Sequence, residues 1–116
     1  MNVEQDVAAH YTHGSLEKAL LDGLAAAGKD LGRLRADDLS AVDEFHIGGR
    51  PATVDLAELM DLKPGMRLLD VGCGIGGPSR YFAGERGAHV TGIDLTDEYV
   101  RAAASLSRMV GLGDRT

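Results

Sequence analysis

The chain has 116 residues, a formal net charge of −6 and a hydrophobic fraction of 44%. This length is near the lower end for one domain, and the acidic balance disfavours nucleic acid or an anionic membrane as a partner. The single cysteine excludes an intrachain disulfide, and no apolar run reaches the roughly eighteen residues of a membrane span. The first 14 residues lack the regions of a signal peptide. The composition predicts a soluble, cytoplasmic protein.

The N-terminal part of the chain is predicted to be helical. Val3–Tyr11 is expected to form a weak helix or arm. Ser15 can cap a helix that runs to about Ala27 and ends at Gly28. One face of this helix is apolar and carries Leu16, Leu20, Leu24 and Ala27.

A basic connector over residues 29–35 leads to a short helix that begins at Asp37 or Asp38 and ends near Val42. Pro51 then opens a helix that runs to about Met60. The apolar side chains expected to face the core are Val54, Leu56, Leu59 and Met60.

An α/β unit follows, with strands over 67–71 and 89–93 and helices over about 78–86 and 97–110. The first strand is expected to be buried because its apolar residues form a short continuous run, Met66, Leu68, Leu69 and Val71. Alternation of strands and helices implies that the two strands are parallel. Asp97 is predicted to be the N-cap of the last helix.

A glycine-rich turn follows the first strand, with glycine at positions 72, 74, 76 and 77. Such a run lets the backbone turn sharply and approach a ligand closely, and Pro78 suits the first turn of the helix behind it. A strand, a glycine turn and a helix N-terminus together are the usual place where α/β proteins hold a nucleotide-like cofactor. Cys73 is interpreted as a small filler of the loop, since nothing near it in sequence lowers a thiol pKa.

Two cofactors compete for this turn, because both the dinucleotide spacing Gly72-x-Gly74-x-x-Gly77 and the spacing Asp70-x-Gly72-x-Gly74-x-Gly76 are present. The carboxylate of Asp70 would repel a pyrophosphate, but it suits the sulfonium and ammonium groups of S-adenosylmethionine. Asp94 ends the next strand, about twenty residues beyond the turn, where an acid can bind two ribose hydroxyls. Ribose is common to both cofactors, so Asp70 favours S-adenosylmethionine and Asp94 supports the site.

These motifs resemble the class I S-adenosylmethionine-dependent methyltransferases. The first motif is LLDVGCGIGGPSRYFA at 68–83, and the second is VTGIDLT at 90–96. The lead-in DEFHIGGRPATVDLAELMDLKPG at 43–65 is similar to that of the small-molecule branch, which includes sarcosine and dimethylglycine, tocopherol and quinone-ring methyltransferases. The resemblance covers roughly residues 43 to 113.

The resemblance implies methyl transfer from S-adenosyl-L-methionine to a small-molecule acceptor by direct displacement. Positioning and desolvation can supply most of this catalysis, so no catalytic residue is predicted. The cofactor site is expected to include Asp70, Gly72, Cys73, Gly74, Gly76, Asp94, Leu95 and Tyr11. Tyr11 is included because a tyrosine on the N-terminal segment of such proteins can close over the cofactor; simple packing is its alternative.

The resemblance also implies a Rossmann-like sheet, of which the sequence supplies two strands. We therefore expect an α/β chain with an N-terminal helical segment over 1–62 and the start of the cofactor-binding domain over 63–116. An incomplete sheet has open apolar edges, which predict self-association or strand exchange between copies. Such a fragment is not expected to be active alone.

Several alternatives stay open on the sequence alone. The protein could be a nicotinamide-dependent oxidoreductase, or a non-catalytic module that binds an adenosyl cofactor. Gly48, Gly49 and Thr53 either border the methionyl end of the cofactor or form a loop and a capped helix. No metal site is expected, because the histidines at 10, 13, 46 and 89 lack trustworthy ligand spacing and are assigned surface or packing roles.

Overall fold

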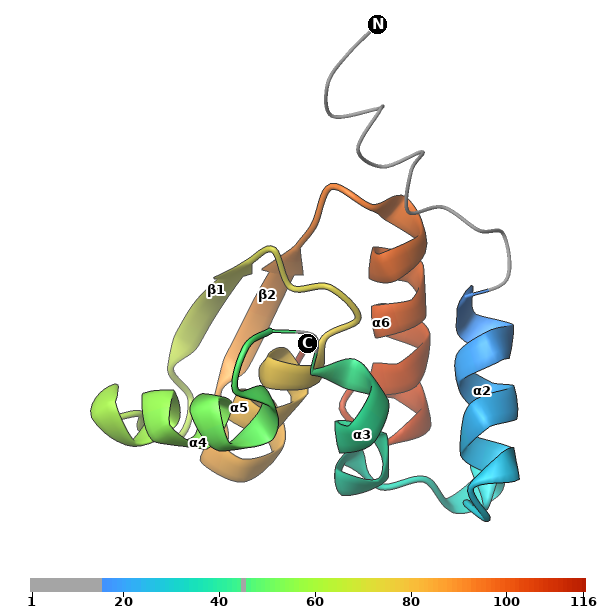
Figure 1. Ribbon diagram of the computed structural model, residues 1–116. Helices are drawn as coiled ribbons and strands as arrows, with labels where there is room; N and C mark the ends of the chain where they lie inside the picture. Colours follow the sequence, from blue (N-terminus) through green and yellow to red (C-terminus); the bar gives the residue numbers. More distant parts are fainter. Residues whose placement is uncertain (1–15, 45) are drawn as a thin grey trace, which may run out of the picture.

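The structure, a computed structural model, describes residues 16–44 and 46–116 (Figure 1). The elements in chain order are α2 (Leu16–Ala26), η1 (Leu31–Arg33), η2 (Ala36–Leu39), α3 (Ser40–Asp43), α4 (Gly49–Leu59), β1 (Arg67–Val71), α5 (Gly77–Arg86), β2 (His89–Ile93) and α6 (Asp97–Met109). The helix expected over 3–11, with Tyr11, and the cap expected at Ser15 lie outside the described residues. None of the described helices is long and apolar enough to cross a membrane.

The two strands form a parallel sheet with the bounds predicted from the sequence. Leu68 pairs with Val90, and Asp70 pairs with Gly92. These four residues share one face of the sheet, because side chains alternate along a strand. Helices α4 and α5 cover this face (Figure 1). The apolar cluster between helices and sheet consists of Ala57, Phe82, Ala83, Ala88 and Val90, with Leu62, Leu68 and Tyr81 partly buried against it.

The opposite face of the sheet is exposed, so the expectation of a buried first strand is wrong: three of its five residues are exposed, and Leu68 and Asp70 are only partly buried. Leu69 is 64% exposed, Val71 72% and, on β2, Ile93 47%. Because these side chains point away from α4 and α5, no described element covers them. On the outer edge of β2, one backbone group has a hydrogen-bond partner: the Val90 N–H donates to the Arg115 carbonyl at 2.8 Å.

The predicted inner face of α4 is also wrong. Thr53 and Ala57 are the buried residues of this helix, whereas Leu56 and Leu59 are exposed. The helix turns Ala57 towards α5 because small side chains allow the two helices to approach closely, and this rotation leaves the leucines outside. Apolar spacing alone could not distinguish these two faces.

A second apolar cluster joins the N-terminal helices to α6. Its buried members are Leu24, Leu34, Leu39, Ile75, Ala102 and Leu106. Ile75 belongs to the glycine turn, so this cluster anchors the turn as well as the helices. A hydrogen bond from the Leu16 N–H to Glu98 Oε1 at 2.7 Å adds to the contact between α2 and α6.

We expect the chain to self-associate through the open edge of its two-stranded sheet, because apolar strands without neighbours recruit other strands, and we expect the exposed apolar face beside that edge to add to the contact. Light scattering at rising concentration should show species larger than a monomer, and Val71→Lys should shift them towards the monomer. Leu59→Lys is the matched control, since Leu59 is exposed on α4 and away from the sheet. A strictly monomeric wild-type chain at high concentration would contradict this expectation.

Candidate functional site

The glycine turn between β1 and α5 folds back on the end of β2. Gly72, Gly74 and Gly76 all have positive φ angles, of 75°, 55° and 88°, a backbone conformation that glycine adopts without steric cost. The N–H groups of Gly72 and Cys73 both donate to the Ile93 carbonyl, at 2.8 and 2.9 Å. The turn therefore lies directly over the carboxyl ends of both strands.

Asp70 lies at the end of β1 and is oriented by the helix that follows the turn. Its Oδ2 accepts a hydrogen bond of 2.7 Å from Ser79 Oγ, in the first turn of α5. Ser79 is buried, so it fixes the carboxylate without exposing a further polar group. The sequence did not single out Ser79; its nine-residue separation from Asp70 becomes a contact only because the turn reverses the chain.

Asp94 holds the turn from the side of β2. Its Oδ2 accepts from the Gly74 N–H and its Oδ1 accepts from the Thr96 N–H, both at 2.9 Å. The expectation that Asp97 caps the last helix is wrong: Thr96 is the N-cap, and Asp97 is the first helical residue. Asp97 instead pairs with Arg101 at 2.9 Å, one helical turn further along α6.

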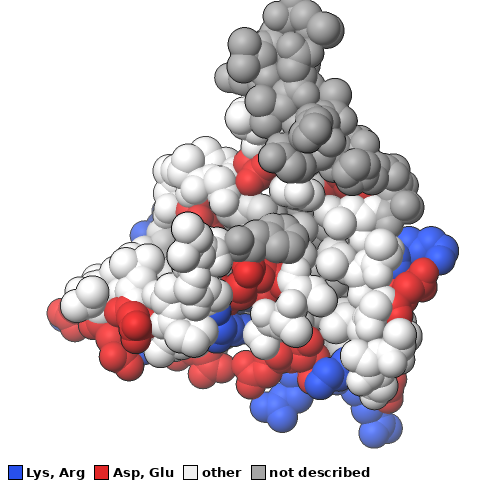
Figure 2. Space-filling model, viewed as in Figure 1, with Lys and Arg blue, Asp and Glu red and all other residues white. Residues whose placement is uncertain are grey.

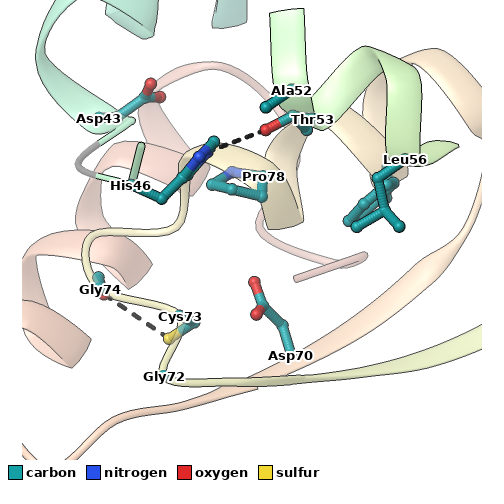
Figure 3. Close-up of a pocket in the computed structure, with 11 residues that line it drawn as sticks. Asp43, His46, Ala52, Thr53, Leu56, Asp70, Gly72, Cys73, Gly74 and Pro78 are labelled. Carbon is teal, nitrogen blue, oxygen red and sulfur yellow. Dashed lines mark hydrogen bonds between the residues drawn. The ribbon is translucent and has the colours of Figure 1, made fainter. Parts of the chain in front are cut away.

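Two cavities adjoin at the turn. The first, of about 540 Å³, is lined by Asp43, His46, Ala52, Thr53, Leu56, Asp70, Gly72, Cys73, Gly74, Pro78 and Phe82 (Figure 3). The second, of about 520 Å³, is lined by Val71, Gly72, Ile93, Asp94, Leu95, Thr96 and Tyr99. Gly72 borders both, with Asp70 on one side and Asp94 on the other. The arrangement suits an elongated ligand with a polar group for each carboxylate.

Most of the residues predicted for the cofactor site line these cavities. Asp70, Cys73 and Gly74 line the first, and Asp94 and Leu95 line the second. Gly76 lines neither; it is buried behind the turn, where an added Cβ would lie 2.9 Å from Arg80 Nη1. Tyr11 lies outside the described residues.

Cys73 is a buried thiol inside the turn. Burial is the first cause that raises its pKa, to about 11, and the carboxylates of Asp70 and Asp94 add to the rise. Its Sγ lies 3.6 Å from the Gly74 carbonyl. These surroundings keep the thiol protonated near neutral pH, which agrees with its interpretation as a filler of the turn.

A polar cluster that the sequence did not predict borders the first cavity. Glu44 has a side chain only 2% exposed, and its Oε2 accepts hydrogen bonds from Thr53 Oγ1 and His46 Nε2, each at 2.7 Å. Arg50 Nε lies 3.0 Å from its Oε1. Thr53 therefore caps no backbone group of its helix; it ties α4 to Glu44. Only the burial of Glu44, which depends on tertiary packing, could have revealed this cluster.

Both ring nitrogens of His46 face acceptors, so the imidazolium form is favoured. The Ile47 carbonyl lies 3.2 Å from Nδ1, and this bond, followed by the one to Glu44, raises the pKa of His46 above its usual value of 6.5. Asp70, across the cavity, adds a smaller contribution in the same direction. His46 is exposed, in line with the surface or packing role expected for it, and its ring also lines the cavity (Figure 3).

We expect the pKa of His46, followed by NMR, to lie above 6.5 and to fall in Glu44→Gln. A raised histidine pKa stabilises the folded state fully below the unfolded pKa of about 6.5. This contribution is lost as pH rises through the folded-state pKa. Glu58→Gln, on the exposed side of α4, is the control and should leave the His46 titration unchanged. An unchanged titration in Glu44→Gln would contradict the assigned ion pair.

Carboxylates dominate the surroundings of the site. Figure 2 shows acidic side chains in the centre of this face, between α4 on the left and α6 on the right. Within residues 16–44 and 46–116 no group of three or more histidine, cysteine or acidic side chains could hold a metal ion.

Comparisons with known proteins agree with this site. Residues 52–116 match the sequence profile of the mycolic acid cyclopropane synthetase family. The chain is 41% identical, over 83 residues, to phosphoethanolamine N-methyltransferase 1 of Zea mays; the match covers 72% of this chain and 16% of that protein. The chain thus spans about one sixth of the length of this relative.

Solved structures share the same architecture. A methyltransferase from Thiobacillus denitrificans, solved with S-adenosyl-L-homocysteine, has a TM-score of 0.59 and 26% identity; the match covers 66% of this chain and 31% of that one. The 4+2 cyclase SpnF has a TM-score of 0.62 and 29% identity, and the match covers 98% of this chain and 40% of that one. These likenesses confirm the expected fold class, helices followed by the first units of a Rossmann-like sheet. Since residues 52–116 are more than half of the chain, it belongs to the mycolic acid cyclopropane synthetase family, with methyltransferases among its relatives.

Proposed function

We propose that the chain carries the S-adenosyl-L-methionine site of an enzyme that transfers a methyl group to a small molecule. The observation that carries this proposal is the placement of Asp70 and Asp94 in two cavities that adjoin at Gly72. Both lie at the carboxyl ends of parallel strands, where α/β proteins bind their ligands. The relatedness to methyltransferases supports the choice of cofactor.

The residues present fit this cofactor at both of its ends. The methionyl part carries an ammonium and a sulfonium group, which suit the first cavity, where Asp70 is held by Ser79 at 2.7 Å. The ribose hydroxyls suit the second cavity, because a carboxylate oxygen of Asp94 can accept a further hydrogen bond beside the one from the backbone. A nicotinamide dinucleotide fits less well, since its pyrophosphate would meet the charge of Asp70.

The chemistry proposed for the site depends on positioning. The cofactor, when bound, supplies a methyl group on a positively charged sulfur. The chain orients it through Asp70 and Asp94, and Leu56 and Phe82 supply apolar walls of the first cavity. Transfer by direct displacement needs no obligatory acid or base, so we assign no catalytic residue.

The acceptor is proposed only as a small molecule. The Zea mays relative is named for methylation of nitrogen, whereas the family is named for cyclopropane synthesis on a lipid carbon chain. We therefore leave the methylated atom open. The cytoplasmic location and the division into segments 1–62 and 63–116 stay predictions.

Calorimetric titration of the chain with S-adenosylhomocysteine tests the proposal. Asp70→Asn should weaken binding about tenfold or more, because a charge-assisted contact to the ammonium group is lost, while the asparagine oxygen can still accept from Ser79. Asp55→Asn, exposed on α4, is the matched control and should bind like the wild type. Tighter binding of NAD than of S-adenosylhomocysteine by the wild type would overturn the proposal.

A further inference from the structure

The guanidinium of Arg80 is buried behind the glycine turn and joins three other parts of the chain. Its Nη2 donates to the Ile75 carbonyl at 2.6 Å and to Asp43 Oδ2 at 3.1 Å. Its Nη1 lies 3.3 Å from both the Ala103 carbonyl and Ser107 Oγ of α6. One side chain thus links the middle of the turn to the end of α3 and to the last helix.

The turn is pressed closely against this ion pair. A Cβ at Gly77 would lie 2.3 Å from the Asp43 carbonyl oxygen, and one at Gly76 would lie 2.9 Å from Arg80 Nη1. The two glycines therefore leave room for the acid and the guanidinium, and no larger residue fits there. The second half of the turn takes its position from Asp43 and Arg80.

The pair is poorly arranged as a source of stability. The side chains of Arg80 and Asp43 are each only 1% exposed. Burial raises the pKa of Asp43, and the charge of Arg80 lowers it by a smaller amount. Asp43 Oδ1 and Arg80 Nε have no hydrogen-bond partner among the described residues. Buried ion pairs of this kind contribute little net stability and can instead select one conformation.

We propose that Arg80, held by Asp43, is a positioning residue that fixes the glycine turn in its cofactor-binding conformation. It touches neither of the site carboxylates Asp70 and Asp94; it acts through the Ile75 carbonyl, between Gly74 and Gly76. Its effect on cofactor affinity rests on the proposed function, whereas its effect on the turn does not. The turn itself offers an independent reporter, because Cys73 is the single cysteine of the chain and is buried within it.

The test measures how fast dithionitrobenzoate labels Cys73 in the native chain, at one pH for all variants. Arg80→Met should raise the labelling rate about tenfold or more, since a buried charged hydrogen bond to the turn is lost. Arg80→Lys should also label faster than the wild type, because an ammonium cannot reproduce the planar fork that reaches Ile75 and α6 together. Full restoration by lysine would mean that only the charge opposite Asp43 matters and would overturn the proposal.

Two further variants separate positioning from folding. The double variant Asp43→Asn with Arg80→Met removes both charges, so no unpaired buried charge is left and its unfolding midpoint in urea should lie closer to that of the wild type than the midpoint of Arg80→Met does. It should still label Cys73 faster and bind S-adenosylhomocysteine more weakly. Arg101→Met removes an exposed arginine that pairs with Asp97. It should change neither the labelling rate of Cys73 nor the affinity for S-adenosylhomocysteine.

Labelling that stays at the wild-type rate in the double variant, or that rises only in proportion to global unfolding, would overturn the positioning role. A wild-type chain that binds no S-adenosylhomocysteine would instead count against the proposed function. The labelling rates would still decide the role of Arg80 in that case.

Discussion

Replacement of Gly77 by alanine should destabilise the protein by about 3 kcal/mol or more, towards the upper range for an overpacked site. The added Cβ would lie 2.3 Å from the carbonyl oxygen of Asp43, far inside contact distance. The atom in the way belongs to the backbone, so no side-chain rotation can relieve the clash. Because typical domains are stable by only about 5–15 kcal/mol, urea unfolding followed by circular dichroism should show a large shift of the midpoint.

Gly23→Ala provides the matched control. Gly23 lies inside α2, and no heavy atom approaches an added Cβ there within 4 Å. Alanine in a helix interior is favoured over glycine by roughly 0.5–1 kcal/mol, so this variant should be slightly more stable than the wild type. Equal midpoints for the two variants would show that the turn can move away from Asp43, and would remove the packing argument.

Replacement of Asp94 by alanine should weaken binding of S-adenosylhomocysteine by about a hundredfold. Two ribose hydroxyls would lose their acceptor, at a cost of roughly 1–3 kcal/mol each. The Gly74 N–H, which now donates to Asp94 at 2.9 Å, would lose its partner as well. Calorimetric titration of the wild type and the variant measures the difference directly.

The conservative change Asp94→Asn should fall between the wild type and alanine, because an amide keeps one acceptor oxygen and loses the charge. Asp97→Ala is the control at the start of α6, where the carboxylate pairs with exposed Arg101. Asp97→Ala should bind like the wild type. If Asp94→Ala did so too, Asp94 would have no part in the ribose contact.

The sequence was sufficient for the features that depend on neighbouring residues. The bounds of β1 follow from a short apolar run, and β2 follows as the next strand of the α/β unit, ended by Asp94. The strand, glycine turn and helix follow from residues 67–86. The placement of Asp70 and Asp94 beside one turn follows from parallel strands, whose carboxyl ends lie together. These are local patterns, or direct consequences of a single topological rule.

Features that depend on distant contacts could not be predicted. The bond between Asp43 and Arg80 joins residues 37 positions apart, and no spacing rule connects an acid on one helix with an arginine on another. The burial of Glu44 beside Thr53 has the same origin. The exposed faces of β1 and α4 were predicted to be buried because apolar residues usually pack against another element. The sequence pattern does not show whether the chain supplies such an element.

If the cofactor binds as proposed, the junction of two cavities at Gly72 makes this a bivalent site. An adenosine alone would bind in the cavity of Asp94, and a methionine alone would bind in the cavity of Asp70. Each would have only the affinity that one cavity provides. A molecule that joins both groups binds the second as an intramolecular event, which can raise avidity by a factor on the order of 10²–10⁴ without any new contact. Selectivity for the intact cofactor over its cellular breakdown products would then come from the covalent link that lets one molecule occupy both cavities across Gly72.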